Sequence, residues 1–146
     1  MTTFAVVTRR IAEKVKGQAD VAVRKATFEL FRNIVLRSPV GNPSLWQSPA
    51  PKGYVGGQFR ANWNFSVGKP NLTTIKSTRQ QRGLQQATKA LSVPAGGIVW
   101  LSNGLPYAKR LEDGWSTQAP TGMVKVSVAE FDLYLKRVLR PPLSVK

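Results

Sequence analysis

Two side chains that carry much of enzyme chemistry are missing from this sequence. The chain has no cysteine and no histidine, which excludes disulfides, thiolate metal sites, a cysteine nucleophile and a Ser-His-Asp triad. Almost every zinc site needs one of these two residues as well. With 42% hydrophobic residues among 146, the chain can still build a core. The composition predicts a single domain, residues 1–146, without the usual hydrolase chemistry.

Acidic residues are scarce, and a long central stretch has none. The chain has 22 Lys and Arg against 7 Asp and Glu, a net charge of +15. The charged residues between Leu30 and Leu111 are Arg32, Arg37, Lys52, Arg60, Lys69, Lys76, Arg79, Arg82, Lys89, Lys109 and Arg110. This stretch cannot neutralise itself, so it faces solvent, an acidic partner surface or a polyanion. A solvated basic surface and a polyanion contact both stay open on this observation.

Long apolar runs are absent too. The run from Phe4 to Val7 is too short for a signal peptide, and Arg9 and Arg10 follow it instead of preceding it. No run approaches the length that spans a bilayer. We therefore expect a protein that is made and used in a cytosol, or in a particle assembled there.

A long amphipathic helix is predicted over residues 4–37. Its apolar positions recur about every 3.6 residues: Ile11, Val15, Ala19, Ala22, Val23, Ala26, Leu30, Ile34 and Val35. Gly17 is its weak point, and Pro39 ends it near Arg37. Because this helix is basic, binding to a membrane surface is one interpretation. Packing of the apolar stripe on the domain's own sheet is the favoured one.

A second amphipathic helix is predicted over residues 123–139, followed by a C-terminal tail at 140–146. Residues 38–57 are expected to form an extended loop, because prolines and glycines interrupt any periodicity. Trp46 and Tyr54 lie in this loop. A large aromatic side chain in a loop either fills the protein's own core or anchors a partner.

Two strands are predicted from the pattern of apolar residues. Residues 59–67 alternate between apolar and polar side chains, which indicates a half-buried strand. Residues 98–101 are continuously apolar, which indicates a strand buried on both faces. We also expect a short strand at 71–76, an exposed arm at 76–82 and short helices at 84–91 and 107–113. The predicted class is α+β, a small antiparallel sheet packed against a long N-terminal helix and a C-terminal helix.

The carboxylates and the aromatic residues form no recognised catalytic pattern. Glu112 and Asp113 are adjacent, and adjacent residues on a helix do not face each other, so Glu112 is expected to pair with Lys109 instead. No nucleotide-binding glycine motif or calcium loop is present. Aromatic residues among basic ones can stack on single-stranded nucleic acid, but those of 59–67 share one strand face and indicate core. No enzyme activity, cofactor or metal is expected.

Two stretches resemble a known protein family. The first runs from Asn103 to Val124 with the pattern N-x-L-P-Y-A-x-x-L-E-x-G-W-S-x-Q-A-P-x-G-M-V. The second joins Ser38-Pro39-Val40 to Gly56-Gly57-Gln58-Phe59-Arg60-Ala61-Asn62-Trp63, although Gly41-Asn42-Pro43 begins a longer loop than the family pattern has. Together they are similar to the tail-completion (neck) proteins of tailed bacteriophages, the group to which that of phage lambda belongs. The resemblance extends over most of the chain.

The resemblance implies a structural virion protein of the phage neck, made in the host cytoplasm, without enzyme activity or cofactor. It implies a six-fold ring around the DNA channel that meets connector or head-completion proteins and tail terminator or tube proteins. On this basis we expect subunit or partner contacts from Trp46, Tyr54, Tyr107, Arg110, Glu112, Trp115, Gln118 and Met123. The residues expected to face packaged double-stranded DNA or an acidic partner are Lys76, Arg79, Arg82 and Lys89.

Two other functions stay open at this point. Within phage assembly, the chain is alternatively a tail terminator that caps polymerisation of the tail tube. Outside it, the net charge of +15 suggests a general nucleic-acid-binding protein. Affinity for DNA that falls steeply with salt in the isolated protein would favour the last of these.

Overall fold

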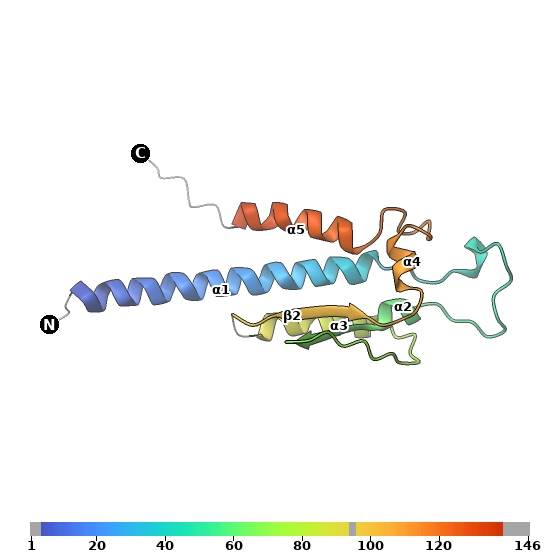
Figure 1. The fold of residues 1–146 in the computed structure, drawn as a ribbon, viewed down its shortest axis with the longest axis horizontal. Helices are drawn as coiled ribbons and strands as arrows, with labels where there is room; N and C mark the ends of the chain where they lie inside the picture. Colours follow the sequence, from blue (N-terminus) through green and yellow to red (C-terminus); the bar gives the residue numbers. More distant parts are fainter. Residues whose placement is uncertain (1–3, 94–95, 139–146) are drawn as a thin grey trace.

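The computed structural model describes residues 4–93 and 96–138, with side chains from 16 to 93 and from 96 to 137. Its elements in chain order are α1 (Phe4–Arg37), the 3-10 turn η1 (Pro43–Leu45), α2 (Gln58–Ala61), β1 (Trp63–Val67), α3 (Gln81–Thr88), the 3-10 turn η2 (Lys89–Ser92), β2 (Val99–Asn103), α4 (Ala108–Glu112) and α5 (Val124–Val138). α1 runs through the middle of an elongated molecule, with α5 along one side and the sheet along the other (Figure 1). The predicted α+β class is therefore confirmed.

The predicted long helix is also confirmed, and α1 continues through Gly17 without a break. Its C-terminal end is held by side chains from α2 and β1. The hydroxyl of Ser38 donates to the Ile34 carbonyl at 2.8 Å and accepts from the Trp63 indole at 2.8 Å. The guanidinium of Arg60 donates to the carbonyls of Leu36 and Ser38 at 2.9 and 2.8 Å. These bonds satisfy carbonyl groups that a helix end leaves unpaired, and they fix the start of the 38–57 loop.

The sheet consists of β1 and β2, which are antiparallel with Trp63 opposite Asn103. The predicted strand over 59–67 is wrong in its first half, where residues 58–61 form the helical turn α2. This turn begins after Gly57, whose φ of 117° lies in the region that favours glycine. Periodicity alone missed the turn because Phe59 and Ala61 are buried in either conformation.

The predicted strand at 71–76 is absent, but this segment, which the structure describes in full, still packs on the sheet. The side-chain amide of Asn62 donates to the Ile75 carbonyl at 3.0 Å and accepts from the Ile75 N–H at 2.8 Å. The amide of Asn64 donates to the Thr73 carbonyl at 2.7 Å. Side-chain amides thus replace a backbone ladder, and both asparagines are buried although the alternating pattern placed them toward solvent.

The expectation that residues 98–101 are buried on both faces is wrong. Ile98 is 66% exposed and Trp100 is 40% exposed. Leu101 packs instead toward α1, beside the buried Phe31. β2 is therefore covered by α1 on one face and is largely open on the other at this end of the sheet.

The core lies between α1, the sheet and the segments around α3 and α4. Its buried residues are Ile34, Val35, Phe59, Trp63, Leu105, Ala119 and Met123, with Phe31, Ala87 and Ala90 in an adjoining cluster. The short helices predicted near α3 and α4 and the C-terminal helix are confirmed. Within the described residues, no helix combines the length and apolar character needed to cross a membrane. The predicted tail, 140–146, lies outside the described residues.

Candidate functional site

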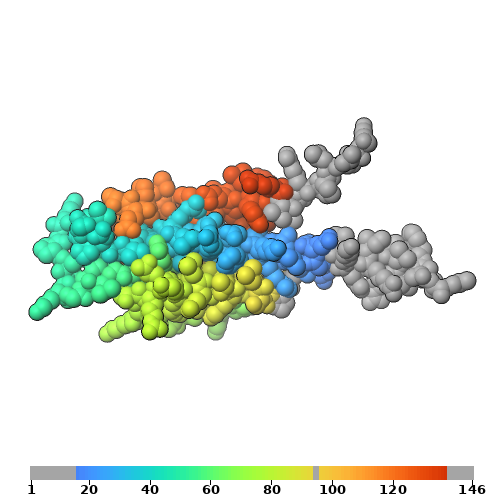
Figure 2. All heavy atoms as spheres, turned by 180° about the vertical axis from the view of Figure 1, so that it is seen from behind, coloured from blue at the N-terminus to red at the C-terminus, as the bar shows by residue number. Residues whose placement is uncertain are grey.

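A groove of about 430 Å³ lies between the 38–57 loop and the turn that follows α4. Its lining residues are Pro39, Gly41, Asn42, Leu45, Trp46, Tyr54, Gly57, Gln58, Phe59, Tyr107, Leu111, Trp115, Ser116, Thr117 and Gln118. None of them is charged, although the chain carries a net charge of +15. We call this feature the aromatic groove. The 38–57 loop, which forms one of its walls, projects at one end of the molecule (Figure 2), the end remote from the start of α1 in Figure 1.

Most of the aromatic residues predicted to make contacts meet in this groove. Trp46 and Tyr54 pack edge to face, with ring centroids 4.7 Å apart. Tyr107 packs on Phe59 at 5.9 Å. Burial raises the pKa of the Tyr107 hydroxyl, and the nearby Tyr54 adds to this shift. The Tyr107 hydroxyl is therefore neutral at physiological pH, and the groove presents uncharged aromatic surface.

Trp115 stands at the rim of the groove and is 74% exposed. The guanidinium of Arg110 lies 5.2 Å from the centre of its ring, a cation–π distance. An exposed tryptophan of this size is the kind of side chain that dominates the energy of protein interfaces. Trp115 and Arg110 therefore remain candidate contact residues.

Gln118 joins the two walls of the groove. Its side chain donates to the Val40 carbonyl at 2.8 Å and accepts from the Val40 N–H at 3.1 Å. On the other side of the loop, any side chain at Gly41 would overlap the Tyr54 hydroxyl. The loop is therefore fixed by close packing and by a two-point amide bond. The Gln118 amide thus holds the two walls together, whereas it was predicted as a partner contact.

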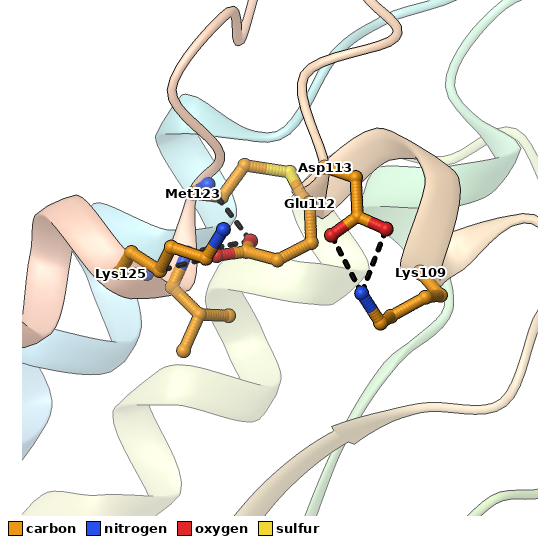
Figure 3. A network of polar contacts seen from close by, with 6 residues as sticks. Lys109, Glu112, Asp113, Met123 and Lys125 are labelled. Atoms are coloured by element: carbon orange, nitrogen blue, oxygen red, sulfur yellow. Dashed lines mark hydrogen bonds and ion pairs between the residues drawn. The ribbon is translucent and has the colours of Figure 1, made fainter.

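The ion pair predicted between Glu112 and Lys109 is wrong. Lys109 pairs with Asp113, Nζ to Oδ1 at 2.6 Å, one turn along the same helix. The carboxylate of Glu112 points the other way, toward the start of α5 (Figure 3). Local helix spacing offered Lys109 either neighbour, and the tertiary fold decided between them.

Glu112 caps α5 from outside that helix. Its two oxygens accept from the backbone N–H groups of residues 123, 124 and 125, each at 2.9 Å (Figure 3). These are donors that the first turn of a helix leaves unpaired. Burial raises the pKa of this carboxyl, but the three backbone hydrogen bonds and the charge of Lys125 outweigh burial and hold its pKa below its ordinary value. Glu112 thus has an internal role in place of the predicted partner contact.

Met123 is a core residue, so its prediction as a partner contact is wrong. Its side chain is 1% exposed and packs in the main core cluster. Met123 directly precedes α5, so its burial follows from tertiary packing and not from the apolar pattern of that helix. Its backbone N–H also donates to the capping carboxylate of Glu112 at 2.9 Å.

Three of the basic residues predicted to face a polyanion or an acidic partner are exposed. Lys76 and Arg79 lie on the segment between β1 and α3, and Lys89 lies at the end of α3. Lys89 Nζ is 3.2 Å from the Gln86 side-chain oxygen, a contact that leaves its charge accessible. These three residues remain candidates for a polyanion surface, which we call the basic surface.

Arg82 does not belong to that surface. Its guanidinium donates to the carbonyls of Ala61 and Trp63 at 2.6 and 3.0 Å, and to the Asn64 side-chain oxygen at 2.7 Å. Trp63 and Asn64 belong to β1, and Ala61 is the last residue of α2, just before that strand. On its outer edge β1 has no neighbouring strand among the residues that the structure describes. Arg82 was predicted to face DNA or a partner, and it instead satisfies the edge of the sheet.

Sequence reasoning missed two residues that shape the site. Arg60 was counted only as part of the basic stretch, yet it anchors the loop at the end of α1, and burial lowers the pKa of its guanidinium. Leu45 is 57% exposed beside Trp46 and lines the groove. The sequence signal that could have identified Leu45 was its position next to Trp46 in a proline-rich loop.

Comparisons of this chain with protein-family models, with curated proteins and with solved structures find no match. The functional argument therefore depends on the residues of the groove and of the basic surface, and on the resemblance carried by the two sequence stretches.

Proposed function

We propose that this chain is a tail-completion (neck) protein of a tailed bacteriophage. In this proposal it has no catalytic activity, is incorporated into the virion at the head–tail junction, and works by docking. One observation carries the proposal. The two stretches that resemble the family, 38–40 with 56–63 and 103–124, are far apart in sequence, yet both contribute residues to the lining of the aromatic groove.

The groove and the basic surface suit two different partners. An uncharged groove with aromatic walls suits a protein segment, because aromatic anchors in partly desolvated pockets supply most of the energy of protein contacts. Lys76, Arg79 and Lys89 suit a polyanion such as packaged double-stranded DNA, or an acidic neighbouring protein. A ring subunit in the neck would use both, since it touches neighbouring proteins and encloses the DNA channel.

Deletion of this gene from the phage that encodes it tests the proposal. Negative-stain electron microscopy of the lysate is expected to show filled heads beside separate tails of normal length. Tails of uncontrolled length would move the assignment to a tail terminator. Intact infectious particles would overturn the proposal and favour a general nucleic-acid-binding protein.

A further inference from the structure

We infer that residues 139–146 of one copy dock in the aromatic groove of a neighbouring copy. This segment follows α5 and contains Arg140-Pro141-Pro142-Leu143, which includes the single Pro-Pro pair of the sequence. The inference deepens the proposed function and rests on it for the ring, because it names the contact that joins one subunit to the next.

The chemistry of the groove fits a proline-rich segment. Aromatic-lined grooves recognise proline-rich chains in the polyproline II conformation, which fit between aromatic rings. Consecutive prolines have little conformational freedom to lose on binding, so less of the contact energy is offset by ordering. Nucleic acid is disfavoured as an occupant because no lining residue carries a charge to neutralise phosphates.

The placement of the groove favours a contact between copies over one within a copy. The groove lies beside α4, near the start of α5, and α5 runs from there toward the other end of the molecule (Figure 1). With 15 residues, α5 is about 22 Å long. The segment that follows α5 is therefore joined to the fold about one helix length away from its own groove. The groove and the segment are different parts of one copy, so their contact between copies is heterologous, and it closes into a ring when the rotation allows it.

The rim of the groove leaves aromatic surface open to the segment. Trp115 carries the guanidinium of Arg110 against its ring, and 74% of its surface stays exposed. Proline rings pack well against exposed aromatic surface of this kind. Pro141 and Pro142 supply such rings.

Sedimentation velocity of the full chain over a range of concentrations tests this contact. The groove variant carries Tyr54→Ala and Trp115→Ala, and the segment variant carries Pro141→Ser and Pro142→Ser. Each is expected to weaken self-association at least tenfold relative to the unmodified chain. The controls are Trp100→Ala, an exposed tryptophan outside the groove, and Pro70→Ser, an exposed proline of a loop. Both are expected to associate like the unmodified chain, and circular dichroism checks that every variant is folded.

An equimolar mixture of the two variants gives the sharpest result. The groove variant keeps an intact segment, and the segment variant keeps an intact groove, so the mixture is expected to form dimers and nothing larger. A mixture that stays monomeric would overturn the inference, as would a segment variant that assembles like the unmodified chain or an unmodified chain that is monomeric throughout. If one of these results were obtained while the gene deletion still gave separate heads and tails, the contact between segment and groove would be ruled out. The proposed function would still hold.

Discussion

Glu112 and Arg60 are charged residues whose hydrogen-bond partners are helix ends inside this chain. Glu112 accepts from the first N–H groups of α5, and Arg60 donates to the last carbonyls of α1. Charges at helix ends meet unpaired backbone groups and the favourable end of the helix dipole. An exposed pair such as Lys109 and Asp113 stabilises far less, because water screens it. The sequence alone does not distinguish a charged residue that caps a helix end from one in an exposed ion pair.

Replacement of Glu112 by Gln tests its capping role. The change removes a charged acceptor shared by three backbone donors, so we expect a loss of about 1 kcal/mol in the free energy of unfolding, measured by urea titration at pH 7. Asp113→Asn, at the residue that follows Glu112 and ends α4, is the matched control and is expected to cost less. Equal losses for the two variants would argue against a cap.

The same variant predicts a change in the pH dependence of stability. In the folded protein the pKa of Glu112 lies below its ordinary value of 4.5. Its contribution to stability is therefore fully present above pH 4.5 and is lost as the pH falls through the lower, folded pKa. As the pH falls from 4.5 toward the folded pKa of Glu112, the free energy of unfolding of the unmodified protein should decrease more steeply than that of Glu112→Gln. Parallel curves of unfolding free energy against pH would contradict this account.

Met123 and Trp115 separate a core role from a contact role. Met123→Ala opens a cavity in the main cluster and is expected to cost about 2–5 kcal/mol of unfolding free energy. Trp115→Ala removes an exposed side chain and is expected to change stability by about 0.5 kcal/mol or less. Thermal or urea unfolding of both variants measures the difference. A large loss for Trp115→Ala would mean that its ring packs inside the fold.

The role of a single residue could be predicted from the sequence when its contact partners lie close to it in the chain. Trp46 and Tyr54 were predicted as contact candidates because a large aromatic in a loop either fills the core or anchors a partner, and the structure places both on the aromatic groove. Glu112 was misassigned because its acceptor role needs residues 123–125, which come eleven to thirteen residues later in the chain, to lie against it. Helix spacing predicts contacts only between residues three or four positions apart.

At the scale of elements, β1 has an outer edge that is closed by side chains of α3. Arg82 donates to the Trp63 carbonyl of that edge and to the Ala61 carbonyl just before it, and the Gln86 side chain accepts from the Phe65 N–H at 3.1 Å. An uncovered strand edge would expose unpaired backbone groups to other chains. A helix thus takes the place of a third strand in this small sheet.

Arg82→Ala is expected to destabilise the protein by about 2 kcal/mol, because partly buried acceptors lose a charged donor. Arg79→Ala, three residues earlier and exposed, is the matched control and should leave stability unchanged. Urea midpoints of the two variants give the comparison. Destabilisation by Arg79→Ala of the same size would show that Arg82 has no special place at the strand edge.

Long elements were predictable, and short ones were decided by tertiary contacts. The periodicity of α1 and α5 extends over several turns, so their existence followed from the pattern alone. Residues 58–61 and 71–76 are too short for a pattern to distinguish a turn or an extended segment from a strand. Asn62 decides both, since its amide bonds the carbonyl of Gln58 and the backbone of Ile75.

The whole molecule carries an uncharged groove and a separate basic surface, and salt distinguishes their uses. Replacement of Lys76, Arg79 and Lys89 together by alanine should weaken non-specific binding to duplex DNA. It should also flatten the slope of log affinity against log salt by about 0.9 for each phosphate that the protein no longer neutralises. A control in which alanine replaces Lys125, Lys136 and Arg137 removes the same charge from α5. Equal effects in fluorescence anisotropy would mean that only net charge matters.

The claim that the aromatic groove serves head–tail joining is tested most directly by complementation of a phage that lacks this gene. Supplied in trans, the chain with Trp115→Ala and Tyr54→Ala is expected to leave filled heads beside detached tails in electron micrographs. Trp100→Ala, which removes another exposed tryptophan elsewhere, is expected to restore complete particles. Complete, infectious particles with the groove variant would contradict the account.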